Sequence, residues 1–194
     1  MGALKPLLPF GPTTVIESCI EYLRAAGVDP IIIVVGPRGE EIRQHLENAD
    51  VVLVENPDHF GKMTSSIACG VSKLPPASRA VMITPADLPA IPSQVVFQLI
   101  NEWRNGHLLV KPTWEDRGGH PILVDLSFKE DLLELDPELG LKSLFESHVD
   151  QVKRLPVDSR YIARDIDTWD DYAALHQEVF GTWPPSLPGS ARTE

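Results

Sequence analysis

Three aspartates stand at positions where the chain could hold a metal ion and do phosphate chemistry. Asp87 follows an apolar run at 80–84, in the sequence TPADLP, where the prolines stiffen a loop and exclude a helix. Asp165 and Asp167 precede a terminal helix, and the alternation of an extended chain would point both carboxylates to one side. Carboxylates on rigid loops suit hard divalent cations, which neutralise charge as a phosphoryl group is attacked. The alternative interpretation is that all three are turn or helix caps.

Two further segments place small and polar residues where a ligand could approach the backbone. Asn56 and Pro57 follow an apolar run, and Ser65 and Ser66 begin a helical pattern, so that free N–H groups at the helix start could face a polar ligand. The serines could equally be plain caps.

The sequence RGGHP at 117–121 has glycines that allow a close approach and a histidine, His120, that can hydrogen-bond a phosphate. A histidine before proline is more often structural. Lys5, considered alone, is a surface charge.

The hydrophobic pattern predicts alternating helices and strands that would position these residues. The first helix begins with the capping-box sequence TVIE at 14–17 and ends at Gly27. The predicted strands are 31–35, 51–54, 80–84, 108–111, 120–124 and 151–155, and the other helices are 40–48, 65–74, 93–105, 127–133, 141–148 and 168–180. The β-branched run at 31–35 indicates a strand covered on both faces. Strands separated by helices predict right-handed crossovers and a three-layer α/β/α fold with a mostly parallel sheet.

Composition limits the classes of function. The chain has 194 residues and a formal charge of 17 − 28 = −11, which argues against a nucleic-acid or anionic-membrane binder. The two cysteines, Cys19 and Cys69, have no disulfide or zinc spacing. The apolar runs are far shorter than the roughly 20 residues that cross a bilayer. We expect one cytoplasmic domain over 1–180, followed by a flexible tail at 181–194.

Five segments, in order, resemble motifs of the MobA-like nucleotidyltransferases, most closely the molybdenum cofactor cytidylyltransferases. They are MGALKPLLP at 1–9, NPDHFGKMTSS at 56–66, TPADLP at 84–89, RGGHP at 117–121 and DIDTWDDY at 165–172. The last is the most specific, with Trp169 in place of the usual proline. Lys62 interrupts the family's Gly-Met pair, and Arg117 replaces its first glycine.

The resemblance implies a role for each candidate residue and a Rossmann-like fold of the nucleotide-diphospho-sugar transferase type. Asp87 would hold Mg²⁺ together with Asp167 or, as the second choice, Asp165. Gly2 and Lys5 would lie beside the nucleotide phosphates. The predicted nucleoside-binding residues are Asn56, Pro57, Ser65 and Ser66, and the predicted acceptor-binding residues are Arg117, Gly119 and His120.

The implied reaction is transfer of a nucleoside monophosphate from CTP or GTP, with CTP favoured, to a phosphorylated small molecule, with release of pyrophosphate. Molybdopterin is the favoured acceptor, and a molybdoenzyme or chaperone is a possible partner. One alternative is a nucleotidyltransferase for a sugar, polyol or lactate phosphate. A second alternative is a non-catalytic nucleotide-binding or interaction module.

The resemblance also implies a first strand at the sheet centre, between the strands at 31–35 and 81–84, which this sequence does not contain. We expect the simplest explanation to be a misplaced start, with the strand encoded upstream. The other two possibilities are a shortened paralogue and a partner that supplies the strand.

Overall fold

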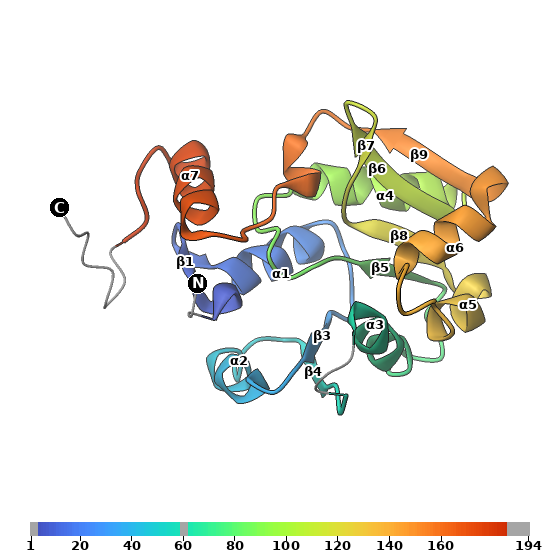
Figure 1. Ribbon diagram of the computed structural model, residues 1–194, viewed down its shortest axis with the longest axis horizontal. Coiled ribbons are helices and arrows are strands. Elements are labelled where there is room, and N and C mark those ends of the chain that lie inside the picture. Colours follow the sequence, from blue (N-terminus) through green and yellow to red (C-terminus); the bar gives the residue numbers. More distant parts are fainter. Residues whose placement is uncertain (1–3, 59–61, 186–194) are drawn as a thin grey trace.

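The computed structural model describes residues 4–58 and 62–185 (Figure 1). Its α-helices are α1 (Val15–Ala25), α2 (Gly39–His45), α3 (Met63–Val71), α4 (Ser93–Arg104), α5 (Lys129–Leu133), α6 (Leu141–Ser147) and α7 (Trp169–Phe180). Its strands are β1 (Pro9–Phe10), β2 (Thr13–Thr14), β3 (Ile32–Val35), β4 (Val52–Glu55), β5 (Ala80–Ile83), β6 (Leu109–Trp114), β7 (Arg117–Gly118), β8 (Ile122–Asp125) and β9 (Val152–Pro156). Short 3-10 turns lie at η1 (Lys5–Leu7), η2 (Leu126–Phe128), η3 (Val149–Gln151) and η4 (Arg160–Ala163). Most of the tail expected at 181–194 lies outside the described residues.

The described strands form one five-stranded sheet, a separate two-stranded sheet and a two-stranded hairpin. β3 and β4 pair in parallel, while the larger sheet has the order β5-β8-β6-β7, with β9 parallel to β6 on its other edge. β8 is antiparallel to both β5 and β6, so β5, β6 and β9 run in one direction. The β1–β2 hairpin was not expected from the sequence.

Helices cover both faces, as the predicted three-layer α/β fold requires. α1 packs against α4, which contacts β6 and β8, and α3 packs against α5 on the other side (Figure 1). The strands and helices expected from the sequence are present within a few residues of their predicted ends. α3 begins at Met63, two residues earlier than predicted.

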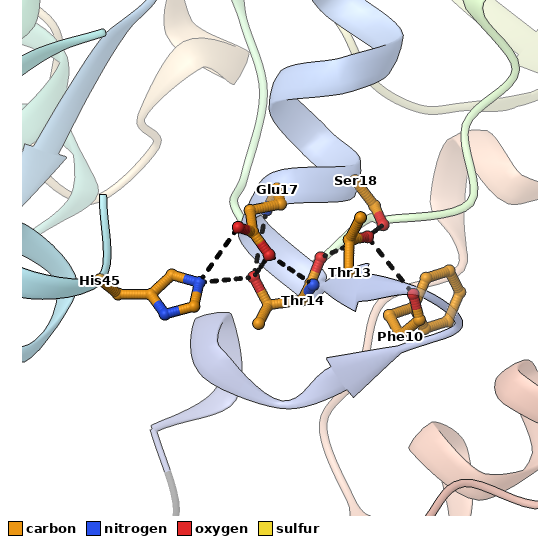
Figure 2. Close-up of polar contacts among 6 residues, drawn as sticks. All are labelled: Phe10, Thr13, Thr14, Glu17, Ser18 and His45. Atoms are coloured by element: carbon orange, nitrogen blue, oxygen red, sulfur yellow. Dashed lines mark hydrogen bonds and ion pairs between the residues drawn. The ribbon is translucent and has the colours of Figure 1, made fainter. Parts of the chain in front are cut away.

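The predicted capping box at the start of α1 is confirmed. The Glu17 carboxylate accepts a hydrogen bond from the Thr14 backbone N–H at 2.8 Å, and the Thr14 hydroxyl accepts one from the Glu17 N–H (Figure 2). Partial burial raises the pKa of Glu17, but the bonds from Thr14, together with the contact with His45, outweigh it and lower the pKa overall. His45 of α2 lies 3.3 Å from the same carboxylate, so this cap also joins two helices.

The helix α7 packs against the N-terminal hairpin through buried polar contacts (Figure 1). The Tyr172 hydroxyl donates to the Pro9 carbonyl at 2.5 Å, and burial raises the pKa of Tyr172 to about 12, which keeps this donor protonated. His176 is buried and accepts from the Gly11 N–H at 3.3 Å through Nε2. Gly11 has φ +62°, and an added Cβ there would clash with the Phe180 ring. The two ends of the described chain are therefore fixed to each other.

One expectation about burial is wrong. The apolar run at 31–35 was expected to be covered on both faces, yet Ile32, Ile33 and Val34 are only half-buried, as is every residue of β5. The physical reason is the separation of the two sheets, since β3 pairs with β4 and β5 with β8, and neither has a second neighbour among the described strands.

We expect Tyr172→Phe to lower the free energy of unfolding by about 1–3 kcal/mol, because the Pro9 carbonyl would lose its donor in a buried position. Urea unfolding would measure this. Val179→Ala on the same helix removes a side chain that is 38% exposed and should change stability by less than about 0.5 kcal/mol. Equal stability of the Tyr172→Phe variant and the native protein would show that this bond does not hold α7.

Candidate active site

The loop after β5 holds Asp87 in a partly buried position. Its base is fixed to α1, where the Tyr22 hydroxyl lies 3.2 Å from Thr84 Oγ1, and Leu88 is buried beneath it. Burial raises the pKa of Asp87, Lys5 opposes this rise, and the charges of Asp165 and Asp167 add to it. A carboxylate under such repulsion gains from any cation that approaches it.

Lys5 in η1 forms an ion pair with Asp167 in the segment between η4 and α7. The Nζ–Oδ1 distance is 2.8 Å, and the side chains are 30% and 67% exposed. The bond to Asp167, with the charges of Asp87 and Asp165, raises the pKa of Lys5, so the ammonium stays charged. Exposed ion pairs of this kind contribute at most about 1 kcal/mol, and a charged ligand can therefore replace one partner at small cost.

The structure thus brings together four residues that are far apart in the sequence. Lys5, Asp87, Asp165 and Asp167 interact electrostatically, with three acids around one base. Among residues 4–58 and 62–185, no three His, Cys, Asp or Glu side chains are arranged to enclose a metal ion. Asp167 contacts Lys5 directly, whereas Asp165 acts on it only through its charge, so the choice between these two as metal ligand stays open.

The predicted nucleoside segment forms a compact polar cluster at the start of α3. Asn56 is buried, and its amide donates to the hydroxyls of Ser65 at 2.9 Å and Ser66 at 3.1 Å. Its side-chain oxygen accepts from the Asp58 N–H at 3.0 Å, which shapes the loop. Pro57 is exposed beside it. These bonds join the loop at Asn56 to the start of α3. The binding role of the four residues stays a prediction.

His120 lies at the carboxyl end of β5. Its Nδ1 is 3.5 Å from the Ile83 carbonyl, and its backbone N–H donates to the Ile162 carbonyl at 2.7 Å. Burial lowers the pKa of His120, and nearby Lys111 lowers it further, so the ring is neutral at physiological pH. With Nδ1 donating to Ile83, the free Nε2 is an acceptor, which suits a hydroxyl better than a phosphate oxygen.

The other two predicted acceptor residues have clear structural surroundings. Arg117 is exposed on β7, after a tight turn in which Glu115 and Asp116 have φ of 47° and 63°. Gly119 is required by packing, since an added Cβ would clash with the Ile162 carbonyl. Two explanations for a glycine at position 119 are therefore open: the close approach of a ligand, as the sequence suggested, and the close backbone contact with Ile162 within the fold.

One cavity joins several of these groups. It has a volume of about 360 Å³, and its lining includes Ser66, Thr84, Ala86 and His120. The nucleoside segment, the Asp87 loop and the acceptor histidine thus border the same space. Gly2 lies outside the described residues.

Sequence reasoning missed Lys111 as a candidate for the site. It lies in β6, near the β7 hairpin, with its Nζ 5.3 Å from the centre of the Phe145 ring. Burial, together with the charge of Arg154, lowers the pKa of Lys111. The sequence did contain a sign of this, because Lys111 directly follows the apolar run at 108–110. A charge at such a position is unfavourable unless a partner or a ligand compensates it.

Within the described ranges, none of the helices combines the length and apolar character needed to cross a membrane.

Comparison with known proteins gives a consistent assignment. Residues 1–152 match the model of the MobA-like NTP transferase domain. A bifunctional IPC transferase and DIPP synthase of Rubrobacter xylanophilus is 36% identical over 77 residues, which are 38% of this chain and 18% of that protein. The chain thus matches less than a fifth of the length of that relative.

Solved structures cover nearly the whole chain. The crystal structure of Rv0371c from Mycobacterium tuberculosis is 26% identical, covers 91% of both chains and superposes with a TM-score of 0.79. The same mycobacterial protein in complex with manganese gives a TM-score of 0.75, with 91% of this chain and 93% of that chain covered. The family match spans most of the sequence and the fold agrees with it, so this chain belongs to the family of MobA-like NTP transferase domains.

Proposed function

We propose that this protein transfers a nucleoside monophosphate from a nucleoside triphosphate to a phosphorylated small molecule. An oxygen of the acceptor phosphate attacks the α-phosphorus, the bond from that phosphorus to the bridging oxygen breaks, and pyrophosphate leaves. The observation that supports this most strongly is the cluster of Lys5 with Asp87, Asp165 and Asp167, next to the cavity lined by Ser66 and His120. We place the reaction in the cytoplasm.

The donor set fits a hard divalent cation. Asp87 and Asp167, with Asp165 as the alternative, supply only oxygen ligands. Burial and, to a smaller extent, the neighbouring carboxylates raise the pKa of Asp87, and a bound cation would offset both effects. The manganese complex of Rv0371c supports a divalent ion, and we propose Mg²⁺. When bound, the ion would neutralise charge on the phosphates and orient them for in-line attack.

Lys5 would then be free to serve the substrate. If a cation takes the Asp167 carboxylate, the ammonium of Lys5 is released from its 2.8 Å contact and can reach the triphosphate. The ordinary pKa of a lysine ammonium, about 10.4, keeps Lys5 charged near neutral pH once the bond to Asp167 is broken. Asn56, Ser65 and Ser66 would orient the nucleoside, with CTP favoured over GTP.

For the acceptor we favour molybdopterin, on the resemblance of RGGHP and DIDTWDDY to cytidylyltransferase motifs. His120 would accept a hydrogen bond through Nε2, while Lys111, missed in the sequence, and Arg117 would supply positive charge for the acceptor phosphate. A sugar, polyol or lactate phosphate is the alternative acceptor, and the similarity to the bifunctional IPC transferase and DIPP synthase supports a transferase in either case. A molybdoenzyme or its chaperone would be the partner in the first case.

The direct test is pyrophosphate release with Mg²⁺, either CTP or GTP, and each acceptor class in turn: molybdopterin, a sugar phosphate, a polyol phosphate and lactate phosphate. We expect release with CTP and molybdopterin, at least about tenfold faster than with any other pair. Release with another acceptor would contradict the proposed substrate but support the proposed type of reaction. Nucleotide binding without release for any acceptor would support a non-catalytic binding module instead.

We expect Asp87→Asn to reduce kcat/KM by about 10²–10⁴-fold, because it removes charge that would hold the metal. The same change should stabilise the fold near pH 7. The raised pKa means that the folded state favours protonated Asp87, so stability is greatest below the ordinary carboxyl pKa and falls as the pH rises through the raised value.

Thermal melting at about pH 7 and about pH 4 would therefore show a higher Tm for the Asp87→Asn variant at neutral pH and a smaller difference in acid. A variant that loses activity and also melts lower would indicate that Asp87 supports the structure instead.

Asp165→Asn and Asp167→Asn form a matched pair that identifies the second metal ligand. Loss of the true ligand should raise the Mg²⁺ concentration for half-maximal rate by about tenfold or more, while loss of the other should change it less than about threefold. We expect the larger effect at Asp167, which lies in contact with Lys5. Small effects in both variants would contradict a metal site at this place.

A further inference from the structure

The parallel strands β6 and β9 carry two cationic side chains in register on one face of the larger sheet. Lys111 of β6 is paired with Arg154 of β9, and side chains at paired positions point to the same face. The Lys111 Nζ lies 5.3 Å from the centre of the Phe145 ring, so this is the face that α6 covers. Like charges at paired positions repel each other and destabilise a sheet unless a further group compensates them.

The rest of this face is apolar. Two residues nearer the start of β6 and β9, the neighbours across four strands all belong to one hydrophobic core: Val81, Val124, Leu109 and Val152. Further toward the carboxyl ends of β6 and β9, Lys111 and Arg154 take the place of such apolar side chains. Ligands of α/β folds bind outside the carboxyl ends of parallel strands. The charge therefore appears on the side of the sheet where a ligand is expected.

Neither cation forms an ion pair with an acid among residues 4–58 and 62–185. The Arg154 Nη2 donates to the Asp116 backbone carbonyl at 2.7 Å, and Lys111 packs on an aromatic ring. Lys153, which comes just before Arg154, points to the opposite face and pairs with Glu102 of α4 at 3.6 Å. The chain has 28 Asp and Glu against 17 Lys and Arg, so composition alone would favour an acid near every cation. The pair of Lys111 and Arg154 departs from that expectation.

Both cations lie against the hairpin that carries the predicted acceptor segment. A Cβ added at Gly118 of β7 would lie 3.2 Å from the Lys111 Nζ, so this glycine leaves the room that the ammonium occupies. Arg154 reaches the same hairpin through its bond to the turn. Burial lowers the pKa of His120 and the charge of Lys111 lowers it further, so these two groups are close. His120 lines the cavity of the candidate site, and the cations therefore lie on its acceptor side.

Two adjacent cations select a doubly charged ligand. A phosphate monoester carries about −1.5 to −2 charges near pH 7 and has three acceptor oxygens. An arginine guanidinium binds two such oxygens at once, and a lysine ammonium binds the group as a point charge. A carboxylate would neutralise only half of the pair, and a neutral hydroxyl would leave the repulsion unchanged.

We propose that Lys111 and Arg154 together bind a phosphate monoester group of the acceptor and thereby select acceptors that carry one. The assignment of this group to the acceptor rests on the proposed transfer reaction, whereas phosphate binding by the two cations does not. Arg154 lies in none of the five motifs, so this site could not be found from them.

The first experiment measures binding without a nucleotide. Glycerol phosphate is added to the full chain and followed by NMR at the Gly118 amide, with glycerol as the uncharged control. We expect saturable shifts with the phosphate only, and at least about tenfold weaker binding by Lys111→Met and by Arg154→Met. The control Lys153→Met removes a lysine from the other face of β9 and should bind as the native protein does.

Each Met variant removes a repulsion, so its Tm should equal or exceed that of the native protein. A lower affinity at an unchanged Tm would therefore report on binding. Equal affinity in both Met variants would overturn the proposal. Absence of shifts at Gly118 in the native protein would overturn it even if a variant fails to fold.

The second experiment assigns the bound phosphate to the acceptor. In the transfer reaction, Lys111→Met and Arg154→Met should raise KM for the acceptor at least about tenfold and change KM for the nucleoside triphosphate less than about twofold. Inorganic phosphate should compete with the acceptor. Binding of inorganic phosphate at Gly118 without competition would assign the site to the free ion and overturn the acceptor role.

Failure of this inference and failure of the proposed reaction give different results. Pyrophosphate release with an unchanged acceptor KM in both variants would overturn the inference and support the reaction. Phosphate binding at the pair in a protein that transfers to no acceptor would support the phosphate site and contradict the reaction.

Discussion

The packing of α7 on the N-terminal hairpin is the interaction on which the candidate site depends. Tyr172 and His176 bind the backbone at Pro9 and Gly11, so the first described residues and the last helix share one small core. The segment just before α7 is thereby held beside η1, and Lys5 reaches Asp167. Without this contact, the site would keep the Asp87 loop but lose both the base and the second acid. The helix α7 thus positions two residues of the candidate site, Lys5 and Asp167.

The acid cluster illustrates a conflict between stability and function. Burial, together with the charges of Asp165 and Asp167, leaves Asp87 with a raised pKa despite the nearby Lys5, and the rest of the fold must offset this cost. The tertiary structure keeps them together because each belongs to a rigid element: the loop after β5, fixed by Tyr22, and the entrance to α7, fixed by its capping box at Thr168. A bound cation would reduce the repulsion among these carboxylates. The arrangement that destabilises the unliganded fold therefore favours cation binding.

A second conflict lies in the sheet itself. β3 and β5 have the apolar sequences of central strands, yet among the described strands each is the last of its sheet. Residues of the helices α1 and α3 line the cavity between these two strands. The Asp87 loop, His120 and Ser66 border the same space, and its occupancy would therefore bear on how rigidly they are held.

The sequence by itself determined the α/β class, the elements within a few residues of their ends, and the capping box at Thr14, because these follow from local periodicity and local hydrogen bonds. It also selected, through their motifs, the residues that we propose for the site. Only the tertiary structure decided that Lys5 pairs with Asp167, that Gly119 is needed for contact with Ile162, and that Lys111 lies near His120. It alone revealed the half-buried edges of β3 and β5. These features depend on contacts between distant segments, and a one-dimensional pattern of polar and apolar residues does not specify which segments meet.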